Sequence, residues 1–341
     1  MDENVLFSEV QRSLFPALQN DKPTSEHPPI FLDGPGGAQV PLSVMQAMQD
    51  YLSLGNSNLG GCFQTSQRTQ LMLDKARTLM RLFVNASSDT HVVFGANMTS
   101  LTFHLSRCLS QNWKSGDEII VTCLDHDANI TPWLIAAKEK QACVHQLSVD
   151  PYTQIDLAEL EYKLSHKTQL VAVTYASNVT GSIQPIQQIT QLAHKYGALV
   201  YVDGVHYAPH DLIDLQQLGA DVLVCSAYKF YGPHLGIACI APHLANSLQP
   251  DKLRAVTTQG EGRFETGTLN FEAIAGLIAC LEYIASLHSQ IEFEALRQKV
   301  QQADFTERAA EFDSDSLWVQ REHFVRAFEQ INAYETALFA G

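Results

Sequence analysis

Five short apolar runs in the middle of the chain constrain its fold more than any other feature of the sequence. They are rich in valine and isoleucine, and they hardly alternate between apolar and polar side chains. Strands that are buried on both faces, as in a parallel sheet, have this pattern because neither face meets water. The runs cover residues 91–94, 118–122, 170–175, 198–202 and 221–225.

Helical patterns separate these runs. The clearest pattern places apolar residues on one helix face, and Gly197 follows it as a C-terminal cap. Its apolar positions are Ile186, Ile189, Leu192, Ala193 and Tyr196. Strands that alternate with helices predict an α/β fold, in which right-handed crossovers connect the parallel strands.

The two ends of the chain differ from this middle. Residues 5–18 have the spacing of an amphipathic N-terminal helix, and a polar link with prolines follows at 20–29. From about residue 286 the chain is more charged, and it carries an acidic stretch at 311–315. A second amphipathic pattern runs through Phe324, Phe328, Ile331, Tyr334 and Leu338. The sequence does not show which surface this apolar stripe packs against.

Composition and charge exclude several kinds of partner. Hydrophobic residues make up 45% of the chain, enough for a sizeable core, and the formal net charge is −15. A nucleic acid or an anionic membrane surface would need a basic face, so we expect neither as a partner. No apolar run is long enough to cross a bilayer, and the acidic residues 1–4 lack the basic start of a signal peptide. The seven cysteines form no C-x-x-C pair, so we expect reduced thiols in a cytoplasmic protein.

Polar residues follow each of the five runs, at the point where the strand would end. In an open α/β sheet, ligands bind beyond the carboxyl ends of the strands. The segments in question are 95–100, 125–129, 177–178, 203–206 and 226–229. Together they would bring a lysine, a carboxylate, histidines, hydroxyl groups and the start of a helix to one edge of the sheet.

This set of groups suits pyridoxal phosphate (PLP). The cofactor needs a lysine amine for its aldehyde, an acid beside its ring nitrogen and an anion site for its phosphate. Lys229 can supply the amine, and Asp203 can keep the ring nitrogen protonated. The backbone N–H groups of residues 97–99 open a helix, where a phosphate is favoured. The hydroxyl groups of Ser226 and Tyr228 can add further donors.

Each of these residues also has an ordinary structural explanation. A lysine after a strand is usually a solvated loop residue, and an aspartate there is usually a cap or turn residue. His126 has the same alternative as a polar loop residue. Lys229 differs because Ser226 precedes it and a Gly-Pro pair at 232–233 follows it in an otherwise apolar stretch. For Asp203, a role in a binding site is favoured because the polar residues at the ends of the neighbouring strands would lie beside it.

A metal site is the main chemical alternative at this edge. The candidate ligands are Asp125, His126, Asp127, Asp203, His206 and His210. Pro209 disfavours the regular helix that would place His206 and His210 on one face. We therefore predict a PLP site without a metal ion, and a metal-dependent hydrolase stays the alternative.

Longer motifs at these strand ends resemble those of class V aminotransferases, which are fold-type I PLP enzymes, and above all their cysteine-desulfurase-like branch. The motifs are DHDAN at 125–129, ASNVTG at 176–181, VDGVH at 202–206, SAYKFYGP at 226–233 and RFETGTLN at 263–270. The resemblance runs from about residue 31 to about residue 288. It implies a large domain with a mostly parallel, mixed central sheet flanked by helices, and a homodimer as the functional unit.

The resemblance also divides the chain into three parts. It implies an N-terminal helical segment over 1–30 and a PLP-binding large domain over 31–287. A linker and the start of a truncated small domain would occupy 288–341.

Around the cofactor ring, the resemblance implies a role for each residue of the predicted site. Lys229 would hold PLP as a Schiff base and carry the α-proton of the substrate. Asp203 would pair with the ring nitrogen, and His126 would stack on the ring face. Asn178 and His206 would lie near the 3-hydroxyl group.

At the phosphate and at the substrate side, the resemblance implies further contacts. Thr268 would reach the phosphate in the neighbouring subunit, and Gly36 and Gly37 would line the substrate side. The residues that would hold the phosphate within one subunit are Asn97, Met98, Thr99, Ser226 and Tyr228.

The chain departs from the desulfurase pattern at several positions. His206 stands where desulfurases carry glutamine, and Tyr228 stands where they carry histidine. Both side chains keep a polar tip, so the departures concern the reaction rather than cofactor binding. Relatives also have a small C-terminal domain with a carboxylate-binding arginine and, in desulfurases, a sulfur-accepting cysteine. No arginine or cysteine here matches those positions, and Arg263 belongs to the 263–270 motif as a structural residue.

We therefore predict a PLP-dependent enzyme that acts on a small amino acid. A desulfurase-like reaction, from L-cysteine to L-alanine and sulfane sulfur, is the leading hypothesis. An aminotransferase or an epimerase of the same family would use the same carbanion chemistry. A PLP-binding scaffold protein with little or no activity is the alternative outside catalysis. The sequence does not identify the amino acid.

Overall fold

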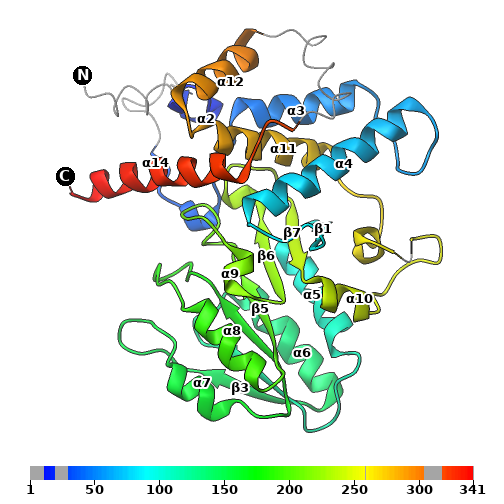
Figure 1. Cartoon of the computed structure of the whole chain (residues 1–341), viewed down its shortest axis with the longest axis vertical. Coiled ribbons are helices and arrows are strands. Elements are labelled where there is room, and N and C mark those ends of the chain that lie inside the picture. Colours follow the sequence, from blue (N-terminus) through cyan, green and yellow to red (C-terminus); the bar gives the residue numbers. More distant parts are fainter. Residues whose placement is uncertain (1–10, 20–29, 258, 303–316, 341) are drawn as a thin grey trace.

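The computed structural model describes residues 11–19, 30–257, 259–302 and 317–340. Over these ranges the chain forms three layers, with a seven-stranded sheet between two layers of helices (Figure 1). The strands are β1 (His91–Gly95), β2 (Glu118–Thr122), β3 (Cys143–Leu147), β4 (Thr168–Thr174), β5 (Leu199–Asp203), β6 (Val222–Ser226) and β7 (Gly236–Ile240).

The strand order confirms the predicted mostly parallel, mixed sheet. The order is β1-β7-β6-β5-β4-β2-β3, and the pairs from β6 to β3 are parallel. β7 runs antiparallel to both of its neighbours, β1 and β6. The five predicted runs correspond to β1, β2, β4, β5 and β6. β3 and β7 were not predicted from the sequence.

Alternate residues of each central strand feed two separate cores. In β4, Val171 and Val173 pack into one core, whereas Leu170 and Ala172 pack into the other. The first core contains residues of α3 (Leu42–Ser53), α4 (Gln64–Phe83), α7 (Leu157–Lys163), α8 (Ile186–Lys195), α9 (Leu215–Leu218) and α11 (Phe271–Ser286). The second core contains residues of α5 (Met98–Ser110), α6 (Thr131–Lys140) and α10 (Pro242–Ser247). Burial on both faces explains why these strands have almost no polar positions.

α8 ends as its sequence predicts. Gly197 has a φ of +82°, the left-handed region that favours glycine. Its N–H donates to the His194 carbonyl at 3.1 Å, and the Ala198 N–H donates to the Ala193 carbonyl at 3.1 Å. These bonds satisfy the last helix carbonyls and turn the chain directly into β5.

The described parts of both chain ends pack on the first core. Of the predicted N-terminal helix, residues 5–10 lie outside the described residues, while α2 (Pro16–Gln19) forms its end. The Phe15 ring packs edge-on against Tyr231 and Tyr283, with ring centroids 5.8 and 5.6 Å away. The acidic stretch at 311–315 also lies outside the described residues. α12 (Gln290–Gln302) packs on α11 and α3.

The C-terminal amphipathic pattern forms α14 (Arg321–Ala340), and the structure identifies the partner of its first half. Phe324 and Phe328 are buried against Phe83 at the end of α4. Farther along α14, the side chains of Tyr334 and Leu338 are exposed. Within the described part of the chain, no helix is long and apolar enough to span a bilayer. The predicted domain boundaries at 30 and 287 stay predictions.

Candidate active site

A cavity of about 140 Å³ opens at the carboxyl edge of β4, β5 and β6, beside the start of α5. This is the edge at which α/β sheets bind ligands. Ten of the predicted site residues line it together: Asn97, Met98, Thr99, His126, Asn178, Asp203, His206, Ser226, Tyr228 and Lys229. The sequence did not single out five further lining residues, which are Pro35, Ala128, Thr174, Ala176 and Val205.

Lys229 lies in the short 3-10 helix η3 (Ala227–Lys229), within the connection between β6 and β7. Its amine donates a hydrogen bond to the Pro35 carbonyl and lies 4.6 Å from the ring centroid of Tyr228. The Tyr228 ring stacks on His234 with centroids 4.9 Å apart. The amine therefore contacts the Pro35 carbonyl on one side and the face of the Tyr228 ring on another.

Asp203 is the last residue of β5, and only 4% of its surface is exposed. Burial raises the pKa of its carboxyl group to about 6, although the hydrogen bond from the Val205 N–H and the positive charge of Lys229 act in the opposite direction. The Val205 N–H donates a hydrogen bond to Oδ1 of this carboxylate at 2.9 Å. Among the described residues, no other hydrogen bond to the carboxylate is found. Oδ2 is thus left for a cationic partner, which a protonated PLP ring nitrogen would supply.

The start of α5 forms the other end of the cavity. The Asn97 side chain caps the helix by accepting the Ser100 N–H at 2.8 Å, and the Met98 N–H donates to the Ser226 hydroxyl at 3.3 Å. A Cβ atom at Gly236 would lie only 2.3 Å from the Asn97 carbonyl carbon. Glycine at 236 therefore allows β7 to support the helix start closely. N–H groups and a hydroxyl at a helix N-terminus fit a phosphate group.

The DHDAN motif forms the loop after β2 and the 3-10 helix η2 (Asp127–Asn129). Nδ1 of His126 accepts the Ala128 N–H at 3.1 Å, which fixes the orientation of the ring. The Asp125 carboxylate accepts hydrogen bonds from the Thr122 hydroxyl and from the Asn129 amide. Burial, with the charge of Asp203 adding to it, raises the pKa of Asp125 to about 7.

The segment 204–211 forms turns rather than a regular helix, as Pro209 predicts. One of these turns brings the Ala208 N–H to the Gly204 carbonyl at 3.0 Å. The His206 and His210 rings nevertheless meet, with centroids 5.2 Å apart. Over the ranges that the structure describes, no cluster of three or more histidine, cysteine or acidic residues could hold a metal ion.

The remaining predicted residues lie beside the cavity or away from it. Gly36 ends the 3-10 helix η1 (Gly34–Gly36), and Gly37 packs against the Tyr228 ring. Thr268 is exposed in the loop after the 3-10 helix η4 (Glu261–Phe264) and does not line the cavity of its own chain. The predicted structural role of Arg263 agrees with its hydrogen bond to the Leu248 carbonyl.

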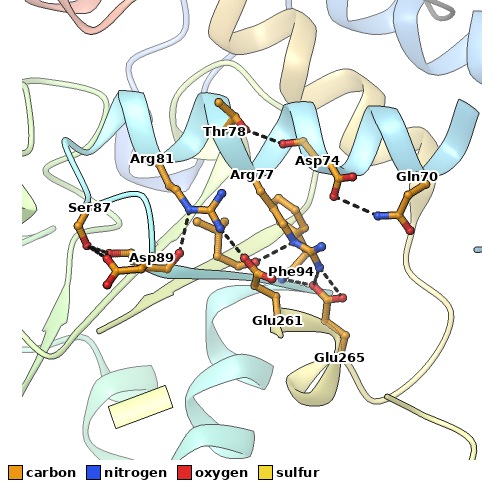
Figure 2. A network of polar contacts seen from close by, with 12 residues as sticks. Gln70, Asp74, Arg77, Thr78, Arg81, Ser87, Asp89, Phe94, Glu261 and Glu265 are labelled. Carbon is orange, nitrogen blue, oxygen red and sulfur yellow. Dashed lines mark hydrogen bonds and ion pairs between the residues drawn. The ribbon is translucent and has the colours of Figure 1, made fainter. Parts of the chain in front are cut away.

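A buried ion pair fixes the segment that precedes Thr268 in the sequence. Nη2 of Arg77, on α4, lies 2.9 Å from both carboxylate oxygens of Glu265, which also accepts the Phe94 N–H at 3.2 Å (Figure 2). Beside it, Arg81 pairs with Glu261 of η4. The loop that carries Thr268 is therefore anchored to α4 and β1.

Comparison with known proteins adds a family to this geometry. The sequence model of the family described as "Aminotransferase class-V" matches residues 30–309. The chain belongs to the class V aminotransferase family. PLP is the cofactor of this family, so the predicted cofactor is confirmed at that level, as is the fold-type I architecture.

Among individual relatives, the chain is similar to cysteine desulfurases in sequence and in fold. A cysteine desulfurase of Synechococcus elongatus is 33% identical over 287 residues, which are 80% of this chain and 46% of that protein. The chain thus spans about half the length of this relative. The aminotransferase-like protein FGM3 of Gibberella zeae is 37% identical over 66% of this chain and 56% of that protein. The crystal structure of the cysteine desulfurase CsdA from Escherichia coli has a TM-score of 0.72 at 29% identity, covering 85% of this chain and 73% of that one.

Proposed function

We propose that this class V aminotransferase family member binds PLP in the described cavity and acts on a small amino acid. One observation carries the proposal: Lys229, Asp203 and the start of α5 surround a single cavity, and each offers the group that one part of PLP requires. When bound, PLP supplies an electron sink that stabilises negative charge at the α-carbon of an amino acid.

Three groups of the chain would hold the cofactor. The Lys229 amine would bind its aldehyde carbon, and the free oxygen of Asp203 would pair with the ring nitrogen. The N–H groups at 97–99, with the Ser226 and Tyr228 hydroxyls, would hold the phosphate. The charge of the ring nitrogen would offset the cost of burying the Asp203 carboxylate.

Residues around the ring would orient it. His126, fixed by the Ala128 N–H, would lie against the ring face, and Asn178 and His206 would lie near its 3-hydroxyl group. Burial, with the charges of His210 and Lys229 adding to it, lowers the pKa of His206. The His206 ring therefore stays neutral near pH 7 and can exchange a hydrogen bond with a hydroxyl group. Once free of the cofactor, the Lys229 amine would carry the α-proton of the substrate.

The reaction that we propose first is desulfurase-like, from L-cysteine to L-alanine and sulfane sulfur. The similarity to cysteine desulfurases in sequence and in fold supports it. Transamination is the second candidate, and the 37% identity to an aminotransferase-like protein favours it. A homodimer, in which each Thr268 reaches the neighbouring cavity, is part of the proposal, and the exposure of Thr268 supports it.

The visible absorption spectrum of the purified protein, before and after borohydride, tests cofactor binding. We expect a band that borohydride removes in the wild type and that is missing in Lys229→Ala. Alanine formation from L-cysteine, with sulfide released from the sulfane sulfur by an added thiol reductant, would then support the desulfurase reaction, whereas consumption of a keto acid would support transamination. A wild-type protein that stays colourless with added PLP would contradict the proposal.

A further inference from the structure

The segment after β5 connects the cavity to the outside of the molecule. His206 lines the cavity, and His210 lies one turn farther along. The ring planes of the two histidines meet at 64° with centroids 5.2 Å apart. His210 is not among the residues that line the cavity, so the His206 ring contacts the cavity and also packs against His210, in the edge-to-face arrangement that aromatic rings favour.

α14 contacts the outer end of this segment. Oε1 of Glu335 lies 3.9 Å from Nδ1 of His210, and the Asn332 amide donates to Oδ1 of Asp211 at 3.3 Å. The other carboxylate oxygen of Asp211 accepts the Tyr207 hydroxyl at 3.2 Å. Two residues of one helix therefore reach two successive residues of the segment.

The surroundings of these contacts are firmly packed. The Tyr207 ring stacks on Tyr175, the residue that follows β4, with centroids 3.7 Å apart and planes 5° from parallel. At its other end the segment is held by Arg321, which begins α14 and donates to the Ile213 carbonyl at 2.9 Å. The same guanidinium group donates to the Phe83 carbonyl at 2.6 Å. α14, the end of α4 and the segment after β5 therefore form one packed unit.

We infer that His210 is a positioning residue that holds the His206 ring against the cofactor cavity, and that α14 supports His210 through Glu335 and Asn332. The inference rests on the proposed function, since His206 affects the cofactor only when PLP occupies this cavity. Without the His210 ring, the His206 ring loses this packing partner. The ring then has more than one rotamer available, and its contact with the cofactor weakens.

The test compares the holoprotein with the variants His206→Ala, His210→Ala and His210→Phe. The PLP dissociation constant and the visible spectrum of the bound cofactor at one fixed pH are measured. His210→Ala should weaken PLP binding by about two- to tenfold, the value expected for one edge-to-face ring contact. It should shift the spectrum in the same direction as His206→Ala. His210→Phe keeps a ring against His206 but loses the contact with Glu335, so its effect should be smaller than that of His210→Ala.

A matched control is His145→Ala, because His145 is a partly exposed histidine on the edge strand β3. It should leave both measurements unchanged. If His206→Ala shifts the spectrum and His210→Ala does not, the positioning inference is overturned while cofactor binding stands. If His206→Ala has no effect and Lys229→Ala still attaches the cofactor, the proposed function itself has failed.

A double variant tests the contribution of α14. Glu335→Gln combined with Asn332→Ala removes both contacts and leaves the His210 ring in place. The spectrum should shift in the same direction as with His210→Ala, by a smaller amount, because an exposed ion pair and one long hydrogen bond are weak. A spectrum identical to the wild type would overturn the part of the inference that concerns α14.

Discussion

Burial gives two carboxyl groups of the site an unusual pH response in the protein without cofactor. The pKa values of Asp203 and Asp125 rise to about 6 and about 7, from a reference of 3.8. A raised carboxyl pKa means that the folded chain binds more protons than the unfolded chain between these values. The free energy of unfolding therefore falls as the pH rises from about 4 to about 7.

Replacing Asp203 should reveal this effect. Relative to the wild type without PLP, Asp203→Asn should gain about 3 kcal/mol in unfolding free energy between pH 4 and pH 8. The reason is that the amide cannot ionise, whereas the buried carboxyl group must. Urea unfolding at several pH values measures the gain, and Asp127→Asn, at an exposed position of the same edge, is the control. A difference between variant and wild type that stays constant with pH would contradict the explanation. PLP binding by Asp203→Asn should weaken.

At the residue scale, the sequence predicts the polar members of the cavity well and its apolar or backbone members poorly. Asp203 ends a strand and Lys229 lies in the short helix that follows one, so both stand next to recognisable apolar runs in the sequence. Pro35 contributes a carbonyl group, which every residue has, and no pattern marks it. The contact of His206 with His210 depends on a turn that Pro209 makes hard to predict. Thr268 lies outside the cavity of its own chain, so its role stays a prediction.

At the element scale, the junction of β7 with α5 is the tightest in the site. Gly236→Ala would place a Cβ atom 2.3 Å from the Asn97 carbonyl carbon and 2.7 Å from the Met98 nitrogen. Because both are backbone atoms, the helix start must move, and such overpacking costs about 1–3 kcal/mol. We expect weaker PLP binding together with lower stability, measured by equilibrium dialysis and urea unfolding. Gly34→Ala meets nothing within 4 Å and should leave the stability unchanged. Wild-type PLP affinity in Gly236→Ala would show that the helix start does not hold the phosphate.

The ion pair between α4 and the chain after η4 leads to a second prediction at this scale. Glu265→Ala leaves the Arg77 guanidinium buried without its carboxylate, and breaking such a pair costs about 3–5 kcal/mol (Figure 2). Urea unfolding measures this loss. Arg326→Ala, which removes an exposed pair with Glu322 on α14, should cost less than about 1 kcal/mol. Equal losses in the two variants would contradict the importance of burial.

The two strands that were not predicted, β3 and β7, show which kinds of strand are hard to recognise from the sequence. β3 is an edge strand whose residues Cys143, Val144 and Gln146 are exposed, so it lacks the continuous apolar run of its neighbours. β7 is fully buried, but its sequence, GIACI, is short and contains small residues. It runs back beside β6 after the connection over 227–235, which carries Lys229. Strand direction is set by pairing partners, and a local pattern does not contain it.

At the scale of the whole molecule, the exposure of Thr268 leads to a prediction about subunits. In a hybrid dimer of Lys229→Ala and Thr268→Ala chains, one cavity would keep Lys229 and also receive Thr268 from its neighbour. Such a dimer should bind one PLP with the affinity of the wild type. If Thr268 acts in its own chain, no cavity of the hybrid is intact and the affinity falls at every site. Titrating PLP into isolated hybrids, and fixing the bound cofactor with borohydride at each concentration, measures the affinity of the one cavity that keeps Lys229 and distinguishes these results.

The place of β7 as the last strand in the sequence affects how the chain folds during translation. β1 leaves the ribosome early, yet the strand that it pairs with in the described sheet is β7, at the far end of the strand sequence. β1 therefore waits unpaired while all the other strands are made. The same late strand supports the helix start through Gly236 and closes the turn that holds Lys229. If PLP binds at the proposed site, a nascent chain would capture it only after β7 has joined the sheet, and cofactor occupancy would then report on completed synthesis and folding of the sheet.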